Sequence, residues 1–251
     1  MDEARLGLPG GIRACLFDLD GVLTETAKLH AEAWKRMFDD FLSSRARASG
    51  QSFVPFDAVG EYDQYVDGKP RADGIRSFLG SRGIELAEGS EGDPAAAETV
   101  QGLGTRKNGI FLSLLRERGV EAYPGSLRYV RAVKSAGLRT AVVSSSTNCR
   151  EALEAADIAD LFDARIDGIV ARERRLPGKP APDTYVAAAR ALGVEPARAA
   201  VFEDALAGVA AGRAGKFGFV VGVDRMGQAR ELRAHGADIV VNDLAELLEA
   251  K

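Results

Sequence analysis

Two aspartates separated by one residue follow a short apolar run near the start of the chain, in the segment 17–24 (FDLDGVLT). The run over residues 12–17 predicts a buried strand. Asp18 and Asp20 stand at its carboxyl end, where parallel α/β proteins bind their ligands. Two crowded carboxylates repel each other unless a cation lies between them or one takes a proton. The segment therefore predicts a hard-metal site, or a nucleophile beside a general acid.

The composition excludes several classes of protein. A net charge of −4 on 251 residues shows no basic excess, so we expect no nucleic-acid partner. No apolar stretch approaches the roughly 20 residues that span a bilayer, so we expect no membrane partner. The N-terminal residues lack the apolar core of a signal peptide, which predicts a cytoplasmic protein. The only two cysteines, Cys15 and Cys149, are not spaced as metal ligands, and we expect both to be core residues.

The chain begins and ends with strand signals but carries a helical block between them. Helical periodicity without strand signals over 26–120 predicts an inserted helical domain. From residue 123 onward, helical segments alternate with apolar runs at 138–144, 162–166, 199–202, 217–221 and 238–241. This alternation predicts an α/β fold, with a Rossmann-like parallel-sheet core and an inserted α-helical domain. We assign residues 1–24 and 122–251 to the core and residues 25–121 to the insertion.

Polar residues stand after several of the predicted strands, directly or on the loop beyond. They are Asp18 with Asp20, Ser144, Lys179, and Glu203 with Asp204. Each set alone fits an ordinary turn, helix start or solvated loop, but the ends of parallel strands converge at one sheet edge. Together, carboxylates suit Mg²⁺, a lysine suits a phosphate, and an aspartate can form an aspartyl-phosphate. The pattern is therefore typical of Mg²⁺-dependent phosphoryl transfer.

Four ordered motifs resemble those of the haloacid dehalogenase (HAD) superfamily. They are 18–24 (DLDGVLT), the strand end at Ser144, 178–183 (GKPAPD) and 202–208 (FEDALAG). The helical insertion is similar to the C1-type cap of that superfamily. Within the superfamily, the chain looks most like the β-phosphoglucomutase-like branch, on the cap residues Thr26, His30, Trp34, Gly68, Arg71, Lys107 and Asn108.

The resemblance implies roles for the residues of the core. Asp18 would be the nucleophile that becomes phosphorylated. Asp20 would be the general acid and base, and a metal ligand through its carbonyl. Ser144 and Lys179 would bind the transferring phosphoryl group. The Mg²⁺ ligands implied are Asp18, Asp20, Glu203 and Asp204.

The resemblance also implies a set of substrate-binding residues. In the cap, His30 would assist proton transfer at Asp20, Arg71 would hold a second phosphate, and Lys107 would contact the sugar. The full set implied is Thr26, His30, Gly68, Arg71, Lys107, Ser145, Ser146 and Asn148. From the residues alone, Lys107 is equally consistent with a solvated face, and Trp34 is more typical of packing.

Three functions compete. The leading prediction is a Mg²⁺-dependent phosphohydrolase acting on a small phosphorylated metabolite, a sugar phosphate. The alternative is a phosphoglucomutase that isomerises β-glucose 1-phosphate to glucose 6-phosphate; Thr147 stands where such mutases usually carry a basic residue. A non-enzymatic protein, either an aspartyl-phosphate receiver or a metal-binding regulatory module, is disfavoured, because receivers lack a large helical insertion. We expect a monomer or a weak dimer.

Overall fold

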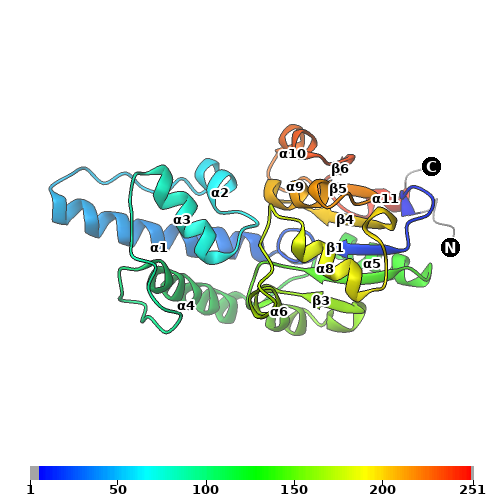
Figure 1. The fold of residues 1–251 in the computed structure, drawn as a ribbon, viewed down its shortest axis with the longest axis horizontal. Coiled ribbons are helices and arrows are strands. Elements are labelled where there is room, and N and C mark those ends of the chain that lie inside the picture. Colours follow the sequence, from blue (N-terminus) through cyan, green and yellow to red (C-terminus); the bar gives the residue numbers. More distant parts are fainter. Residues whose placement is uncertain (1–5, 250–251) are drawn as a thin grey trace. The chain divides into compact units, whose positions relative to one another are not determined.

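The computed structural model describes residues 6–249 and divides the chain into two compact units (Figure 1). The first, the core unit, comprises Met1–Glu25, Gly68–Pro70 and Val120–Lys251. The second, the helical unit, comprises Thr26–Asp67 and Arg71–Gly119. The segment Gly68–Pro70 thus groups with the core unit, although the residues on either side of it belong to the helical unit. The division predicted from the sequence, with 25–121 as one inserted helical domain, stays a prediction.

The core unit is built on a parallel sheet of six strands, which confirms the predicted α/β fold. The strands are β1 (Ala14–Phe17), β2 (Arg139–Val143), β3 (Ala164–Ile166), β4 (Ala199–Glu203), β5 (Phe219–Val223) and β6 (Ile239–Val241), in the order β3-β2-β1-β4-β5-β6. In the register of the sheet, Phe17 lies opposite Val142 and Phe202. The three central strands therefore end together, and the residues that follow them start from one edge.

Helices cover both faces of this sheet, and two apolar clusters fill the space beneath them. One face carries α5 (Pro124–Ser135), α6 (Cys149–Ala155) and α11 (Glu246–Glu249). The other carries α8 (Asp183–Ala191), α9 (Leu206–Ala214) and α10 (Ala229–His235). Leu16 and Phe17 point to opposite clusters, as alternation along a strand requires. Burial on both faces explains why the strands read as continuous apolar runs.

The helical unit packs four helices around aromatic residues. They are α1 (Thr26–Ser49), α2 (Gly60–Tyr65), α3 (Arg71–Ser81) and α4 (Val100–Arg118). Trp34 stacks on Phe38 with ring centres 5.2 Å apart, and Phe38 also contacts Phe78 over 4.3 Å. Trp34 is buried in this cluster, so the packing role predicted for it is confirmed.

Three short helices were not predicted from the sequence: α2, α7 (Gly168–Glu173) and α10. Each has only six or seven residues, too few for periodicity to be recognised. Side chains start two of them. The Asp167 carboxylate accepts from the amides of Ile169 and Val170, and Asp57 accepts from Val59 and Gly60. Such helices depend on caps and tertiary packing rather than on their own propensity.

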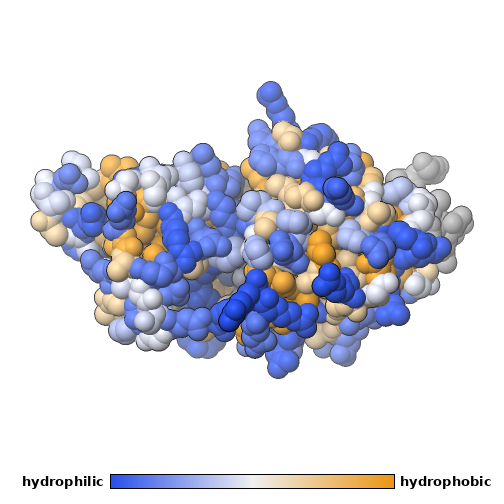
Figure 2. Space-filling model, in the orientation of Figure 1, coloured by the Kyte–Doolittle hydropathy of each residue, from blue (hydrophilic) through white to orange (hydrophobic). Residues whose placement is uncertain are grey.

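The surface in Figure 2 is largely hydrophilic and both cysteines are buried, as the composition predicts. Hydrophilic residues predominate on the face that Figure 2 shows, and the apolar residues on it form separate patches. Cys15 and Cys149 are both buried, unpaired thiols, as expected. Within residues 6–249, no helix combines the length and the apolar character needed to cross a membrane.

Candidate active site

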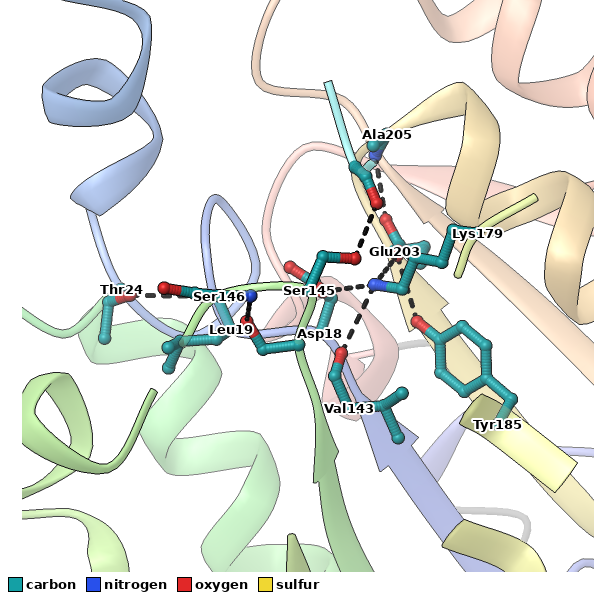
Figure 3. Close-up of polar contacts among 12 residues, drawn as sticks. Asp18, Leu19, Thr24, Val143, Ser145, Ser146, Lys179, Tyr185, Glu203 and Ala205 are labelled. Carbon is teal, nitrogen blue, oxygen red and sulfur yellow. Dashed lines mark hydrogen bonds and ion pairs between the residues drawn. The ribbon is translucent and has the colours of Figure 1, made fainter. Parts of the chain in front are cut away.

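The amine of Lys179 lies between two carboxylates at the strand ends (Figure 3). Its Nζ donates to Oδ1 of Asp18, to Oε1 of Glu203 over 2.5 Å, and to the carbonyl of Val143 over 3.2 Å. Asp18 follows β1 and Glu203 ends β4, so the register of the sheet brings the two acids side by side. All three charged side chains are buried. The structure therefore brings together residues separated by more than 150 positions in the chain.

Glu203 is held by three groups at once. Its Oε1 also accepts from the hydroxyl of Tyr185 over 3.0 Å, and its Oε2 accepts from the amide of Ala205 over 3.0 Å. Sequence reasoning missed Tyr185, because a tyrosine inside the amphipathic helix α8 is typical of packing. Because both Glu203 oxygens have protein partners, one function of this carboxylate is to orient Lys179.

The absence of a side chain at Gly208 leaves room for Glu203. A Cβ at Gly208 would lie 1.7 Å from Oε1 of Glu203, so Gly208→Ala must displace that carboxylate. We expect turnover to fall by about 100-fold, because small misplacements of the groups at a reacting centre cost that much. Gly109→Ala in α4, where a Cβ meets nothing within 4 Å, is the matched control and should keep full activity. Steady-state rates check both variants; an active Gly208→Ala enzyme contradicts the role given to Glu203.

Three acids at this edge form a cluster suited to a hard cation. Asp18, Glu203 and Asp204 each offer a carboxylate oxygen, and these oxygens lie within 4.8 Å of one another. The ammonium of Lys179 pairs with two of these carboxylates, those of Asp18 and Glu203, so a divalent cation would offset the remaining negative charge of the cluster. Asp20 lies two residues beyond Asp18, is partly buried and forms an isolated backbone bridge with Thr24. The donor set is all oxygen, which fits Mg²⁺.

The protonation of Asp18 and Lys179 is mutually dependent. Burial raises the pKa of the Asp18 carboxyl, and the Lys179 ammonium opposes that rise. Burial alone would lower the pKa of Lys179, but the carboxylates of Asp18 and Glu203 outweigh it and raise that pKa above its ordinary value. Lys179 is therefore cationic at neutral pH. A second cation beside Asp18 would further favour the ionised carboxylate of Asp18.

The turn after β2 is held by its own hydroxyls. Ser144 Oγ accepts from the amide of Ser146 over 3.0 Å, and Ser146 Oγ accepts from the amide of Asn148 over 3.1 Å. Ser145 points elsewhere: its hydroxyl donates to the carbonyl of Gly68 over 2.8 Å. Ser144 is buried beside the strand end, where its amide donates to Ile166. The predicted phosphate-binding residues 144–148 thus form one ordered turn next to β1.

A second polar cluster lies in the helical unit. Lys107 is only 3% exposed, and its Nζ lies 2.5 Å from Nδ1 of His30. The same ammonium lies over the rings of Trp34 and Phe111, 5.0 and 4.9 Å from their centres. This burial contradicts the reading of Lys107 as part of a solvated face. Burying an ammonium costs desolvation free energy, so the presence of one here indicates a function.

Arg71 lies close to this cluster in the helical unit. Its guanidinium donates to Oδ1 of Asn108 over 2.9 Å and to the carbonyl of Gly104 over 3.3 Å. Thr26 is buried at the start of α1. The pKa of His30 lies well below its usual value. Burial is the largest cause, and the positive charges of Lys107 and Arg71 lower the pKa further. His30 is therefore neutral at physiological pH.

The low pKa of His30 makes stability depend on pH. In the unfolded chain the imidazole takes up a proton near pH 6.5, whereas in the folded protein it does so only at lower pH. The folded state therefore loses stability as the pH falls below about 6.5, by up to about 1.4 kcal/mol per pH unit. His30→Asn keeps an acceptor for Lys107 but removes the titration, so its stability should fall less on acidification. Urea unfolding at about pH 7 and about pH 5 measures this; the exposed His235→Asn variant is the control, and equal losses in His30→Asn and the wild type contradict the prediction.

Comparisons with known proteins agree with this geometry. Residues 12–216 match the family model of haloacid dehalogenase-like hydrolases. The chain belongs to this family. It is 58% identical over 246 residues to a β-phosphoglucomutase of Mycobacterium bovis, covering 97% of this chain and 94% of that protein.

Solved structures of the family share the fold. The chain resembles a β-phosphoglucomutase from Clostridium difficile with a TM-score of 0.73 and 27% identity, covering 94% of this chain and 93% of that one. It resembles CbbY from Rhodobacter sphaeroides, solved with xylulose-(1,5)bisphosphate, with a TM-score of 0.68 and 27% identity, covering 94% and 96%. The chain is accordingly an HAD-type phosphoryl-transfer enzyme, as the sequence motifs predicted.

Proposed function

We propose that this HAD enzyme is a β-phosphoglucomutase, which converts β-glucose 1-phosphate to glucose 6-phosphate through a phosphorylated Asp18. The observation that carries the proposal is the 58% identity to a β-phosphoglucomutase over nearly the full length of both chains. The comparisons therefore support the alternative drawn from the sequence better than the leading prediction of a phosphohydrolase. Both reactions share the aspartyl-phosphate and differ in whether a sugar hydroxyl or water removes it.

The residues of the core unit would perform the transfer in two steps. Asp18 attacks the phosphorus of a bisphosphate, the bond to the sugar oxygen breaks, and Asp20 protonates the leaving oxygen. In the return step Asp20 removes the proton from the accepting hydroxyl, which attacks the phosphorus and releases Asp18. Lys179 already contacts Asp18, so its ammonium would offset charge on the transferring oxygens. Ser144 would donate a hydrogen bond to the same group.

A Mg²⁺ ion is proposed for the acidic cluster. Asp18, Asp204 and the backbone carbonyl of Asp20 would hold it, with Glu203 close by. When bound, the ion would stabilise negative charge on the phosphoryl group. Because both Glu203 oxygens already accept hydrogen bonds from the protein, its role as a direct ligand stays a prediction.

The remaining candidates would recognise the sugar phosphate. Arg71 would hold the non-reacting phosphate, with a guanidinium already oriented by Asn108. Lys107 would contact the sugar, and the neutral imidazole of His30 would assist Asp20. The other proposed substrate-binding residues are Thr26, Gly68, Ser145, Ser146 and Asn148. The bisphosphate bound in the CbbY structure supports a sugar-phosphate substrate.

A phosphohydrolase is the second candidate, because Thr147 replaces the basic residue usual beside the phosphate-binding turn of the mutases. Less positive charge there would hold a bisphosphate less well and favour release of the sugar before the return transfer. A cytoplasmic location and a monomeric or weakly dimeric state stay predictions from the sequence.

One assay separates the two functions. The purified enzyme receives β-glucose 1-phosphate and Mg²⁺, with and without a trace of β-glucose 1,6-bisphosphate, and glucose 6-phosphate and free phosphate are both measured. A mutase forms glucose 6-phosphate with little phosphate release, and the bisphosphate shortens its lag. α-Glucose 1-phosphate is the control for the anomer. Release of phosphate as the main product contradicts the proposal and favours the hydrolase.

A further inference from the structure

An arginine holds the turn that follows the two aspartates after β1. Arg225 lies between β5 and α10, and its side chain is only 16% exposed. Its Nε donates to the carbonyl of Gly21 over 2.8 Å, and its Nη1 donates to the carbonyl of Asn242 over 2.7 Å. The guanidinium also lies 3.7 Å from the centre of the Tyr123 ring. These contacts immobilise the arginine on three sides.

Gly21 connects Arg225 to the acidic cluster. Its backbone has a φ of +83°, and a Cβ there would lie 1.7 Å from Oδ2 of Asp204. The main chain at Gly21 therefore lies directly against the Asp204 carboxylate. The Gly21 amide donates to the carbonyl of Thr24 over 2.8 Å, which closes a tight turn immediately after Asp20. A bond that orients the Gly21 carbonyl consequently restrains both the backbone of Asp20 and the position of Asp204.

The loop that carries Arg225 is itself held in one conformation. The Asp224 carboxylate accepts from the four successive amides 226–229, over 2.6 to 3.2 Å. In the same loop, Gln228 Nε2 lies 3.4 Å from the carbonyl of Asp204. The loop 224–228 thus contacts the backbone after β1 and the backbone after β4. It is a preformed support for both acidic segments.

The ring contact of Arg225 braces a second segment. Tyr123 donates its amide to the carbonyl of Leu23 over 3.0 Å, and the amide of Glu25 donates to Glu121 over 2.9 Å. The segments 23–25 and 121–123 therefore pair with each other beside the turn at Gly21. Arg225 bonds the carbonyl of Gly21, two residues before the first segment, and lies over the ring of Tyr123 in the second.

We propose that Arg225 is a positioning residue, which keeps the Gly21 turn in the conformation that presents Asp20 and Asp204 to the phosphoryl group. It does not itself touch the reacting atoms. A lysine cannot replace it, because bridging two carbonyls while stacking on a ring requires the planar guanidinium fork. The proposal rests on phosphoryl transfer at this site but not on which sugar phosphate is the substrate.

The test compares Arg225→Lys and Arg225→Met with Arg198→Met, which removes an arginine that bonds the Gly11 carbonyl at an exposed position. Turnover is measured with β-glucose 1-phosphate and with p-nitrophenyl phosphate. In both Arg225 variants we expect kcat to fall about 10- to 100-fold while KM changes less than about threefold, because supporting groups orient rather than bind. Arg198→Met should match the wild type.

Backbone hydrogen exchange supplies a readout independent of activity. The amides of residues 21–24 should exchange at least about tenfold faster in both Arg225 variants, while those of β1 and β4 stay protected. Unchanged exchange at the turn, full kcat in Arg225→Lys, or a loss confined to KM would each overturn the proposal. If wild-type enzyme turns over p-nitrophenyl phosphate but forms no glucose 6-phosphate, the proposed function fails while the role of Arg225 is still tested.

Discussion

Replacing Asp18 with asparagine should abolish turnover of β-glucose 1-phosphate and leave the fold intact. An amide oxygen is a poor nucleophile toward phosphorus, so we expect kcat to fall by at least about 10⁴-fold, as for other enzymes that lose a nucleophile. The fold should survive because Lys179 keeps its bonds to Glu203 and Val143. Rapid quenching followed by intact-mass measurement should detect a phosphorylated wild-type protein and none in the variant.

The control for this variant is Asp238→Asn. Asp238 precedes β6, at the opposite edge of the sheet, and its carboxylate accepts from the amide of Val220 over 2.8 Å. It should keep wild-type turnover, which would show that losing an aspartate next to a strand of this sheet is not itself inactivating. Turnover of Asp18→Asn within about tenfold of the wild type would rule out Asp18 as the nucleophile, since such a loss is far below that of a missing nucleophile.

Replacing Lys179 with methionine should remove activity and also destabilise the protein. The substitution leaves the buried carboxylates of Asp18 and Glu203 without their ammonium. Breaking a buried ion pair in this way costs about 3–5 kcal/mol of unfolding free energy. Urea unfolding measures the loss. Lys134→Met, which removes a partly exposed lysine bonded to the carbonyl of Asp160, should change stability by less than about 0.5 kcal/mol.

The destabilisation by Lys179→Met should shrink as the pH falls. Burial raises the pKa of Asp18, and Lys179 is the group that opposes this rise, so the variant raises that pKa further. A carboxyl whose pKa is higher in the folded than in the unfolded protein binds a proton on folding, so its cost shrinks as the pH falls through the folded pKa and is gone below the unfolded pKa. The variant should therefore approach wild-type stability on acidification. A deficit that is constant from about pH 8 to about pH 5 would contradict the coupling.

Added Mg²⁺ offers a further check on the same variant. A cation held by Asp18 and Asp204 would replace part of the charge that Lys179 supplied, and any ligand that binds only the folded state raises its stability. We expect Mg²⁺ to raise the unfolding midpoint of Lys179→Met more than Ca²⁺ does, because the smaller ion suits a compact carboxylate site. Equal effects of both ions would count against a specific magnesium site.

Much of the fold could be predicted because the sheet is buried on both faces. Strands such as β4 read as uninterrupted apolar runs, and long helices such as α1 carry clear helical periodicity. The short helices α2, α7 and α10 could not be recognised, since six or seven residues are too few to show a periodic pattern and such helices depend on tertiary packing.

The site residues that stand directly at strand ends could be predicted from the sequence. Asp18, Ser144 and Glu203 come directly at the ends of neighbouring strands, so a parallel register is enough to bring them together. Lys179 lies on the loop beyond β3, where the strand pattern alone fits a solvated lysine equally well, and the motif resemblance strengthened its assignment. Tyr185 and Arg225 carried no signal, because a helix tyrosine and a loop arginine have many ordinary roles.

The sequence alone determined the chemistry of this protein: which acids, amine and hydroxyl follow which strands, and therefore that phosphoryl groups are transferred. The tertiary structure alone decided the electrostatics, by burying Lys179 between Asp18 and Glu203 and Lys107 against His30. The reason is physical. Periodicity specifies elements one at a time, whereas the energy of a charge depends on burial and on neighbours that are distant in the chain.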